Sequence, residues 1–146
     1  KLRIGLIGLG KDWDARLAPA LRALGDRYEV RAVCEEVVLR AEQAARQFDA
    51  EVVEGFRAVV RRDDVDAVFI LSGRWFGPLP ILAACEHGKA VFCSPSWDCQ
   101  AGQLAGLKKR IDEAGIAFMA DFPRRVAPAT LRLKELIATQ LGRPRL

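Results

Sequence analysis

Two glycines near the amino terminus, Gly8 and Gly10, follow an apolar run and stand just before a stretch with the apolar spacing of a helix. In a strand–turn–helix unit, the first glycine permits a tight turn and the second lets the main chain approach a pyrophosphate. The N–H groups that open the helix then face the negative charge. Trp13 stands where the third glycine of this dinucleotide fingerprint belongs, so the pattern is incomplete. Pyrophosphate binding and a simple glycine turn are therefore both open.

Glu35 stands at the end of the second predicted strand, where an acidic side chain bonds the ribose hydroxyls of a dinucleotide and repels a 2′-phosphate. The competing interpretation is a solvated strand end, with Glu36 beside it. If Glu35 meets a ribose, the sequence favours NAD(H) over NADP(H) as the cofactor. The alternative that no cofactor is bound stays open.

Arg74 and His87 are two further candidates for chemistry. Arg74, in the glycine-containing segment 72–77, could meet a phosphate or a carboxylate, although an exposed arginine without a ligand is the commoner case. His87, the only histidine, precedes Gly88 at the end of a predicted helix, where the helix dipole favours it. That place is far from the strand ends at which ligands bind, which argues against a catalytic base. We expect neither a catalytic residue nor a metal site in this chain.

The three tryptophans, Trp13, Trp75 and Trp97, fall in predicted loops after the first, fourth and fifth strands. These strands are neighbours in the expected sheet, so their loops converge on one crevice. The rings would stack on a flat ligand, plug the space for a nicotinamide, or pack beneath the loops. Plugging or packing is favoured over stacking.

The elements that position these residues follow from the apolar pattern. Strands are predicted over 2–8, 28–34, 51–53, 66–71, 90–93 and 116–120. Helices are predicted over 38–48, 56–61, 78–87, 99–114 and from 128 towards Gly142, with 121–125 as a loop. Pro19 predicts a first helix that begins near it, after a broken turn capped by Asp12 or Asp14. The alternation predicts an α/β fold, a doubly wound parallel sheet of the Rossmann type with strand order 3-2-1-4-5-6.

Composition indicates a single folded domain over residues 1–146, because 51% of the residues are hydrophobic. The net charge of +4 arises from mixed charges and no basic cluster, so no nucleic-acid partner is expected. No apolar run reaches the roughly eighteen residues of a membrane helix, so no membrane partner is expected either. No signal peptide is expected. The cysteines form no C-x-x-C pair and read as small hydrophobic residues of a reducing, cytoplasmic compartment: Cys34, Cys85, Cys93 and Cys99.

Several segments together resemble the N-terminal nucleotide-binding domain of the glucose–fructose oxidoreductase and inositol dehydrogenase family (Gfo/Idh/MocA). They are Gly8-Leu-Gly10, Val30-Arg-Ala-Val-Cys-Glu35, Asp64-Val-Asp-Ala-Val68, Ala83-Ala-Cys-Glu-His-Gly-Lys89, Arg125-Val-Ala-Pro128, Leu133-Lys-Glu-Leu-Ile137 and Gly142-Arg-Pro144. The resemblance implies an NAD(P)-dependent dehydrogenase of sugars or polyols, in which a substrate domain follows this one. Here the chain is expected to lack that domain, so a separate substrate or partner domain is an expected partner beside the dinucleotide.

Three loops depart from the family pattern, and the first is the glycine turn, where Trp13 replaces the third glycine. After the fourth strand the family has Thr-Pro-Asn-x-x-His, and the chain has Ser72-Gly-Arg-Trp-Phe-Gly77. After the fifth strand the family has Glu-Lys-Pro, whose lysine assists catalysis beside the nicotinamide, and the chain has Ser94-Pro-Ser96. The lysine is lost with no replacement visible in the loop, because proline carries neither charge nor backbone donor.

These observations lead to one expectation of function and one alternative. The expectation is an NAD(P)-binding Rossmann domain of an oxidoreductase-like protein that is not catalytic on its own. The alternative is a non-enzymatic scaffold or interaction module that kept the fold and lost the cofactor. The predicted cofactor-binding residues are Gly8, Gly10, Lys11, Asp12, Trp13, Glu35, Ser72, Gly73 and Arg74.

Overall fold

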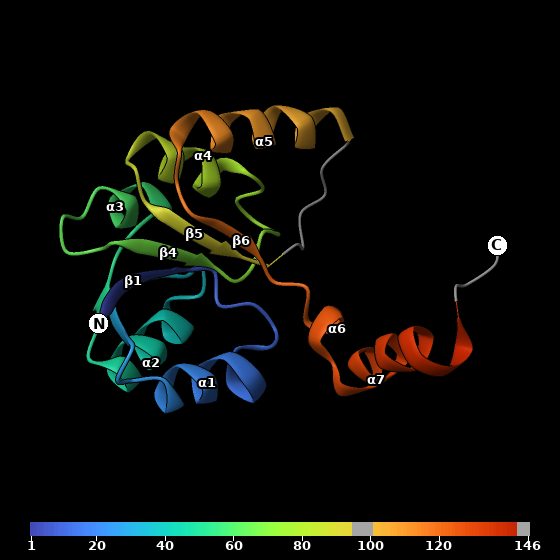
Figure 1. Cartoon of the computed structure of the whole chain (residues 1–146). Helices are drawn as coiled ribbons and strands as arrows, with labels where there is room; N and C mark the ends of the chain where they lie inside the picture. The colour runs from blue at the N-terminus through green and yellow to red at the C-terminus, as the bar shows by residue number, and fades with distance from the viewer. Residues whose placement is uncertain (95–100, 143–146) are drawn as a thin grey trace.

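The computed structural model describes residues 1–94 and 101–142, and in them a six-stranded parallel sheet forms the centre of the molecule (Figure 1). The strand order is β3-β2-β1-β4-β5-β6, which confirms the predicted order. The strands are β1 Leu2–Ile7, β2 Tyr28–Cys34, β3 Glu51–Val52, β4 Ala67–Ile70, β5 Ala90–Cys93 and β6 Phe118–Ala120. Parallel pairing brings the carboxyl ends of all these strands to one edge of the sheet.

Helices cover both faces of the sheet (Figure 1). The segments η1 Trp13–Leu17, α1 Ala18–Ala23 and α2 Val38–Phe48 lie on one face. The helices α3 Phe56–Val60, α4 Leu79–Glu86 and α5 Ala101–Ala114 lie on the other. Along β1 the side chains alternate between the two cores: Ile4 and Leu6 pack towards α1 and α2, and Ile7 packs towards α3 and α4. Burial on both faces explains why β1 is apolar throughout after Arg3.

The first helix begins irregularly, as Pro19 predicts. The N–H groups of Arg16 and Leu17 both donate to the carbonyl of Asp12, at 3.0 and 3.1 Å, and the second of these bonds is the i→i+5 bond of a π-helix. Regular α-helix starts at Ala18, with Pro19 in its first turn, where the missing N–H leaves no bond unmade.

A short helix lies where the sequence predicts a loop. The helix α6 spans Pro123–Val126, within and beyond the predicted loop 121–125, so that prediction is wrong for its last residues. Pro123 opens α6 at a position that needs no N–H donor. Pro128 forces Ala127 into an extended conformation (φ −60°, ψ 138°), which ends α6 after one turn.

The chain after β6 forms an arm that stands away from the sheet (Figure 1). This C-terminal arm consists of α6, α7 Pro128–Leu136 and η2 Ile137–Leu141, none of whose residues is buried. Four of its large apolar side chains are exposed: Val126, Leu131, Leu133 and Leu141.

Ion pairs join the amino ends of the strands, at the edge opposite the glycine turn. Arg3 pairs with Asp66, Arg31 with Glu29 and Asp64, and Arg62 with Asp64 and Glu51; we call these residues the amino-end network. Hydrogen bonds from the side chain and main chain of Arg3 lower the pKa of Asp66 to about 2. Bonds from Arg62 and Arg31 hold the pKa of Asp64 well below its usual range.

The described cysteines are free thiols that differ in burial. Cys34 and Cys93 are buried free thiols and Cys85 is a half-buried one, whereas Cys99 lies outside the described residues. Burial raises the pKa of Cys93 to about 12.

Within residues 1–94 and 101–142, every helix is too short or too polar to cross a membrane.

Candidate functional site

A cavity of about 740 Å³ opens at the carboxyl edge of the sheet. Its walls come from residues that follow β1, β4, β5 and β6, among them Gly10, Ser72, Ser94 and Asp121. Ligands of doubly wound sheets bind at this edge, beside the strand at which the winding reverses. We call this cavity the crevice. Of the predicted cofactor residues, those that line it are Gly10, Lys11, Asp12, Ser72, Gly73 and Arg74.

The glycine turn between β1 and η1 requires glycine for two separate reasons. Gly8 and Gly10 have φ angles of +62° and +70°, in the left-handed region that side chains disfavour. A Cβ at Gly8 would also lie 2.9 Å from the carbonyl oxygen of Ser72, and one at Gly10 would lie 2.7 Å from that of Leu71. The turn therefore lies directly against the end of β4. Because Gly10 itself lines the crevice, main chain forms the wall there, as a bound pyrophosphate requires.

Glu35 does not extend into solvent at the end of β2, because its side chain is only 4% exposed. Its Oε2 accepts a hydrogen bond from the N–H of Leu9 at 2.7 Å, and its Oε1 accepts one from the N–H of Glu36 at 3.0 Å. The carboxylate is thus held against the glycine turn. Glu35 does not line the crevice as the described residues define it, and lies at its β2 side.

Arg40, on the first turn of α2, links the glycine turn to the end of β2. Its Nη2 donates to the carbonyl oxygen of Gly10 at 2.7 Å, and its Nη1 lies 3.9 Å from Oε2 of Glu35. The guanidinium therefore braces the turn and partly neutralises the carboxylate. Sequence reasoning missed Arg40. The sequence signal that could have found it is an arginine in the first turn of the helix that follows Glu35.

Trp13 turns away from the crevice and into the core. Its side chain is 4% exposed and packs on Phe48 of α2, with the ring centroids 5.7 Å apart. Leu9 and Leu21 belong to the same buried cluster. The structure therefore favours packing for Trp13, which does not line the crevice.

Neither Trp75 nor His87 lines the crevice. Trp75 is 68% exposed and does not line it, and Trp97 lies outside the described residues. His87 lies at the carboxyl end of α4, where its Nδ1 is 2.9 Å from the carbonyl oxygen of Ala83. The position of His87 agrees with the expectation that it lies away from the strand ends, and neither Trp13 nor Trp75 lines the crevice.

Charged side chains of both signs face the crevice. Lys11, Arg16 and Arg74 are cationic, and Asp12 and Asp121 are anionic. Arg16 of η1 and Asp121, which follows β6, form an ion pair with Nη2 and Oδ2 2.6 Å apart. Sequence reasoning missed this pair, because its members are 105 residues apart and only the folded sheet brings them together.

The loop after β5 is described only in part. Ser94 lines the crevice, whereas Pro95 and Ser96 lie outside the described residues, so the predicted loss of the loop lysine rests on the sequence. In the part of the chain that the structure describes, no group of His, Cys, Asp and Glu side chains is arranged to hold a metal ion.

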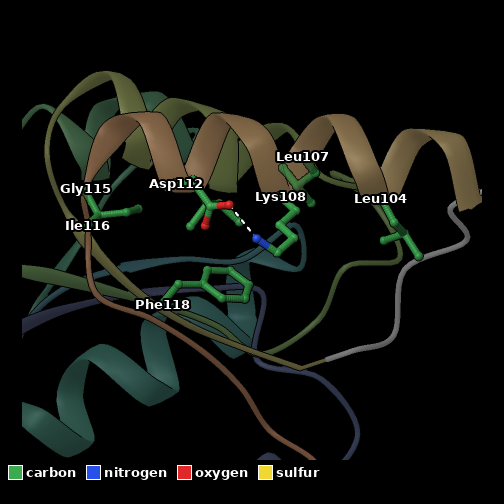
Figure 2. Close-up of a pocket in the computed structure, with 8 residues that line it drawn as sticks. Leu104, Leu107, Lys108, Asp112, Gly115, Ile116 and Phe118 are labelled. Atoms are coloured by element: carbon green, nitrogen blue, oxygen red, sulfur yellow. Dashed lines mark hydrogen bonds and ion pairs between the residues drawn. The ribbon is translucent and has the colours of Figure 1, made fainter.

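A second hollow of about 660 Å³ runs between α5 and β6, away from the strand ends (Figure 2). Its lining is mainly apolar, with Leu104, Leu107 and Phe118 facing it, and an ion pair between Lys108 and Asp112 crosses its side (Figure 2). The two charged side chains of this lining, Lys108 and Asp112, are exposed and pair with each other. The crevice is therefore the better candidate for a functional site.

Comparisons with known proteins show which family the chain resembles. Residues 2–95 match the model of the GFO_IDH_MocA family, described as an oxidoreductase family with an NAD-binding Rossmann fold. An inositol 2-dehydrogenase from Acidiphilium cryptum is 33% identical over 153 residues, which cover 98% of this chain and 43% of that protein. A D-xylose 1-dehydrogenase (NADP(+)) from Haloferax volcanii is 27% identical over 97% of this chain and 43% of its own length.

A solved structure shows the same fold with a cofactor. The 3-ketoreductase KijD10 from Actinomadura kijaniata, crystallised with NADP and TDP-benzene, superposes with a TM-score of 0.81 at 29% identity. The match covers 94% of this chain and 42% of that one. The chain therefore spans less than half the length of the relatives it matches.

Proposed function

Because the chain belongs to the GFO_IDH_MocA oxidoreductase family, we propose that it forms the NAD(P)-binding domain of an oxidoreductase and binds a dinucleotide in the crevice. The observation that carries the proposal is Gly10, whose main chain forms the crevice wall directly after β1. A side chain at that position would meet the carbonyl oxygen of Leu71, so the turn keeps its shape only with glycine.

The residues around the crevice fit the parts of a dinucleotide in order across the sheet. The glycine turn would take the pyrophosphate on main-chain N–H groups, with Lys11 beside it. Glu35 lies on the β2 side, where an adenosine ribose would lie. The nicotinamide half would then extend over β4 and β5, beside Ser72 and Ser94. When bound, the nicotinamide ring supplies the group that accepts or donates hydride.

Among nicotinamide cofactors we expect NAD(H) to bind better than NADP(H). Glu35 and the exposed Glu36 stand at the end of β2, where the ribose of a bound dinucleotide would lie, and their negative charges would disfavour a 2′-phosphate. Arg40 is a cation that would favour NADP(H) instead. Two of the relatives are also named with NADP, the Haloferax volcanii dehydrogenase and the KijD10 complex. The guanidinium of Arg40 already donates to Gly10, however, and lies against Glu35. We therefore assign Arg40 to support of the turn.

Turnover by this chain alone is not expected. Its sequence has Ser94-Pro-Ser96 where the family has Glu-Lys-Pro, and no lysine stands there to assist hydride transfer. The substrate would then have to be positioned by residues outside this domain. The second candidate function is a scaffold without cofactor, which the altered loops after β4 and β5 favour.

Isothermal titration of the chain with NADH, NADPH and ADP-ribose tests the proposal. We expect all three to bind, NADH more tightly than NADPH, and a panel of sugars and polyols to give no NADH formation. Tighter binding of NADPH would reverse the cofactor assignment. If none of the three binds at millimolar concentration, the scaffold is the correct function.

A further inference from the structure

We propose that Asp121 is a positioning residue, which holds Arg16 in the crevice as its anion-binding group. The ligand group beside Arg16 is then a phosphate or a carboxylate. This inference rests on the proposed function only in that the same crevice is used.

The ion pair spans the crevice from one side to the other. Arg16 lies on η1, which follows β1, and Asp121 follows β6, so the ends of β4 and β5 lie between them in the sheet. Both side chains line the cavity. The N–H of Asp121 donates to the carbonyl oxygen of Cys93 at 2.8 Å, which continues the pairing of β5 and β6 by one residue. The carboxylate of Asp121 therefore projects from a fixed main-chain position.

Arg16 differs from the other cations of the crevice because an ion pair holds its side chain in place. Within residues 1–94 and 101–142, Lys11 and Arg74 are exposed and make no ion pair, whereas Arg16 is paired with Asp121 at 2.6 Å. An ordered side chain loses less conformational freedom when a ligand binds. Arginine is also the side chain whose planar fork matches phosphate and carboxylate. The bond to Asp121 uses Nη2 of Arg16, which carries only some of the five N–H donors of the guanidinium.

The exposures of the two side chains agree with this division of roles. The carboxylate of Asp121 is 17% exposed, and the guanidinium side chain of Arg16 is 45% exposed. The anion is therefore the more enclosed partner, and the cation keeps a surface towards the crevice. An ion pair this accessible contributes little to folding stability, so its removal should leave the fold intact.

A competing role for Asp121 makes the opposite prediction. If Asp121 only competed with the ligand for Arg16, its replacement by asparagine would free the guanidinium and remove a negative charge, and anions would bind more tightly. If Asp121 positions Arg16, the same replacement weakens anion binding. The two roles are therefore separated by the sign of one change in affinity.

The experiment titrates the purified chain and its variants with NADH, ADP-ribose, D-gluconate and inorganic phosphate. The variants are Arg16→Met, Asp121→Asn, Asp121→Glu and the double variant Arg16→Met/Asp121→Asn. Arg22→Met and Asp26→Asn are matched controls, because both residues are exposed and neither lines the crevice. Thermal unfolding of every variant shows that the fold is kept.

We expect Arg16→Met to weaken at least one of these anions about tenfold, and Asp121→Asn to weaken the same anion by a smaller factor. The double variant should bind no worse than Arg16→Met, since Asp121 acts through Arg16. Asp121→Glu should restore part of the affinity, which a purely structural role would not predict. Loss of ADP-ribose binding identifies the cofactor pyrophosphate as the anion, and loss of gluconate or phosphate binding alone identifies an acidic substrate group.

Three results overturn the inference: Asp121→Asn binds as tightly as the unchanged chain or more tightly, the double variant is additive, or no anion depends on Arg16. Failure of the proposed function is separate. If the chain binds neither NADH nor ADP-ribose but binds phosphate through Arg16, the proposed cofactor is refuted and the anion site is kept. A chain that binds NADH without any dependence on Arg16 does the reverse. A chain that binds none of the four probes refutes both.

Discussion

The carboxylate of Glu35 and the main-chain N–H of Leu9 form a hydrogen bond of 2.7 Å between residues 26 positions apart. Leu9 is fully buried, so its N–H has little access to water. The bond therefore ties the end of β2 to the glycine turn in addition to any contact with a ribose. Under the proposed function, one side chain would then affect both stability and cofactor preference.

Glu35→Ala should destabilise the fold, because it leaves the N–H of Leu9 without its acceptor. A buried donor left unpaired costs about 1–3 kcal/mol. Glu35→Gln keeps an acceptor oxygen and removes the charge, so it should retain most of the stability and narrow the preference for NADH over NADPH. Urea unfolding and titration with both cofactors measure the two effects. Glu36→Gln is the control, and equal losses of stability in the alanine and glutamine variants would contradict the role assigned to the acceptor.

Gly10→Ala should cost more stability than Gly88→Ala. Both glycines have a positive φ, +70° and +64°, so alanine meets similar backbone strain at either position, roughly 1–3 kcal/mol. Only at Gly10 would the new Cβ also meet a carbonyl oxygen at 2.7 Å, whereas no atom lies within 4 Å at Gly88. The difference in urea midpoint between the two variants isolates the contact with β4. Equal midpoints would mean that the end of β4 moves aside at little cost.

Trp13→Ala should lower stability by about 3–5 kcal/mol, as for other large aromatic side chains removed from a core. Its ring is 4% exposed and contacts Phe48, and it does not line the crevice. Trp13→Phe should keep most of the packing, and the affinity of this variant for NADH should equal that of the unchanged chain. A clear gain in NADH affinity in Trp13→Phe or Trp13→Gly would show that the indole obstructs the cofactor.

Acrylamide quenching gives an independent reading of the tryptophans. In a variant with Trp75→Phe and Trp97→Phe, fluorescence comes from Trp13 alone and should be shielded. In the variant that keeps only Trp75, whose side chain is 68% exposed, quenching should be strong. Strong quenching of Trp13 would contradict its place in the core.

The stability of the chain should fall in acid partly through Asp66. Arg3 lowers the pKa of Asp66 from 3.8 to about 2 in the folded state. A carboxyl group with a lowered folded pKa stabilises the fold above its unfolded pKa, and this contribution disappears as the pH falls from about 4 through 2. Asp66→Asn should therefore be less stable than the unchanged chain at pH 5, with the difference shrinking towards pH 2. Urea unfolding across this range measures it, and Asp63→Asn, an exposed neighbour, should show no such trend.

The fold was predictable because its central strands are buried on both faces. Runs such as β4 Ala67–Ile70 and β5 Ala90–Cys93 are apolar throughout, and their alternation with helices permits few topologies. The helix α6 was not predictable from periodicity, since a helix of one turn has no apolar stripe to detect. Its limits are set by the two prolines at 123 and 128.

The site was predictable only as far as the main chain determines it. A turn after the first strand must reach the carboxyl edge of the sheet, so Gly10 and Ser72 were expected at the crevice. The bonds from Arg40 to Gly10 and from Arg16 to Asp121 depend on how far flexible side chains reach between segments distant in sequence. Trp13 begins the π-helical turn Trp13–Leu17, whose irregular spacing no helical pattern in the sequence predicts.

The amino-end network has a consequence for how this domain tolerates change. Arg3, Arg31 and Arg62 fasten three of the strand beginnings to their neighbours at the edge remote from the crevice. The loops of the crevice edge contribute little to that fastening. Exposed residues of those loops, such as Arg74 and Trp75, could therefore be exchanged for those of other oxidoreductases while the sheet still assembles. Substitutions at such positions are then a practical route to new ligands on this scaffold, with the core and the amino-end network left unchanged.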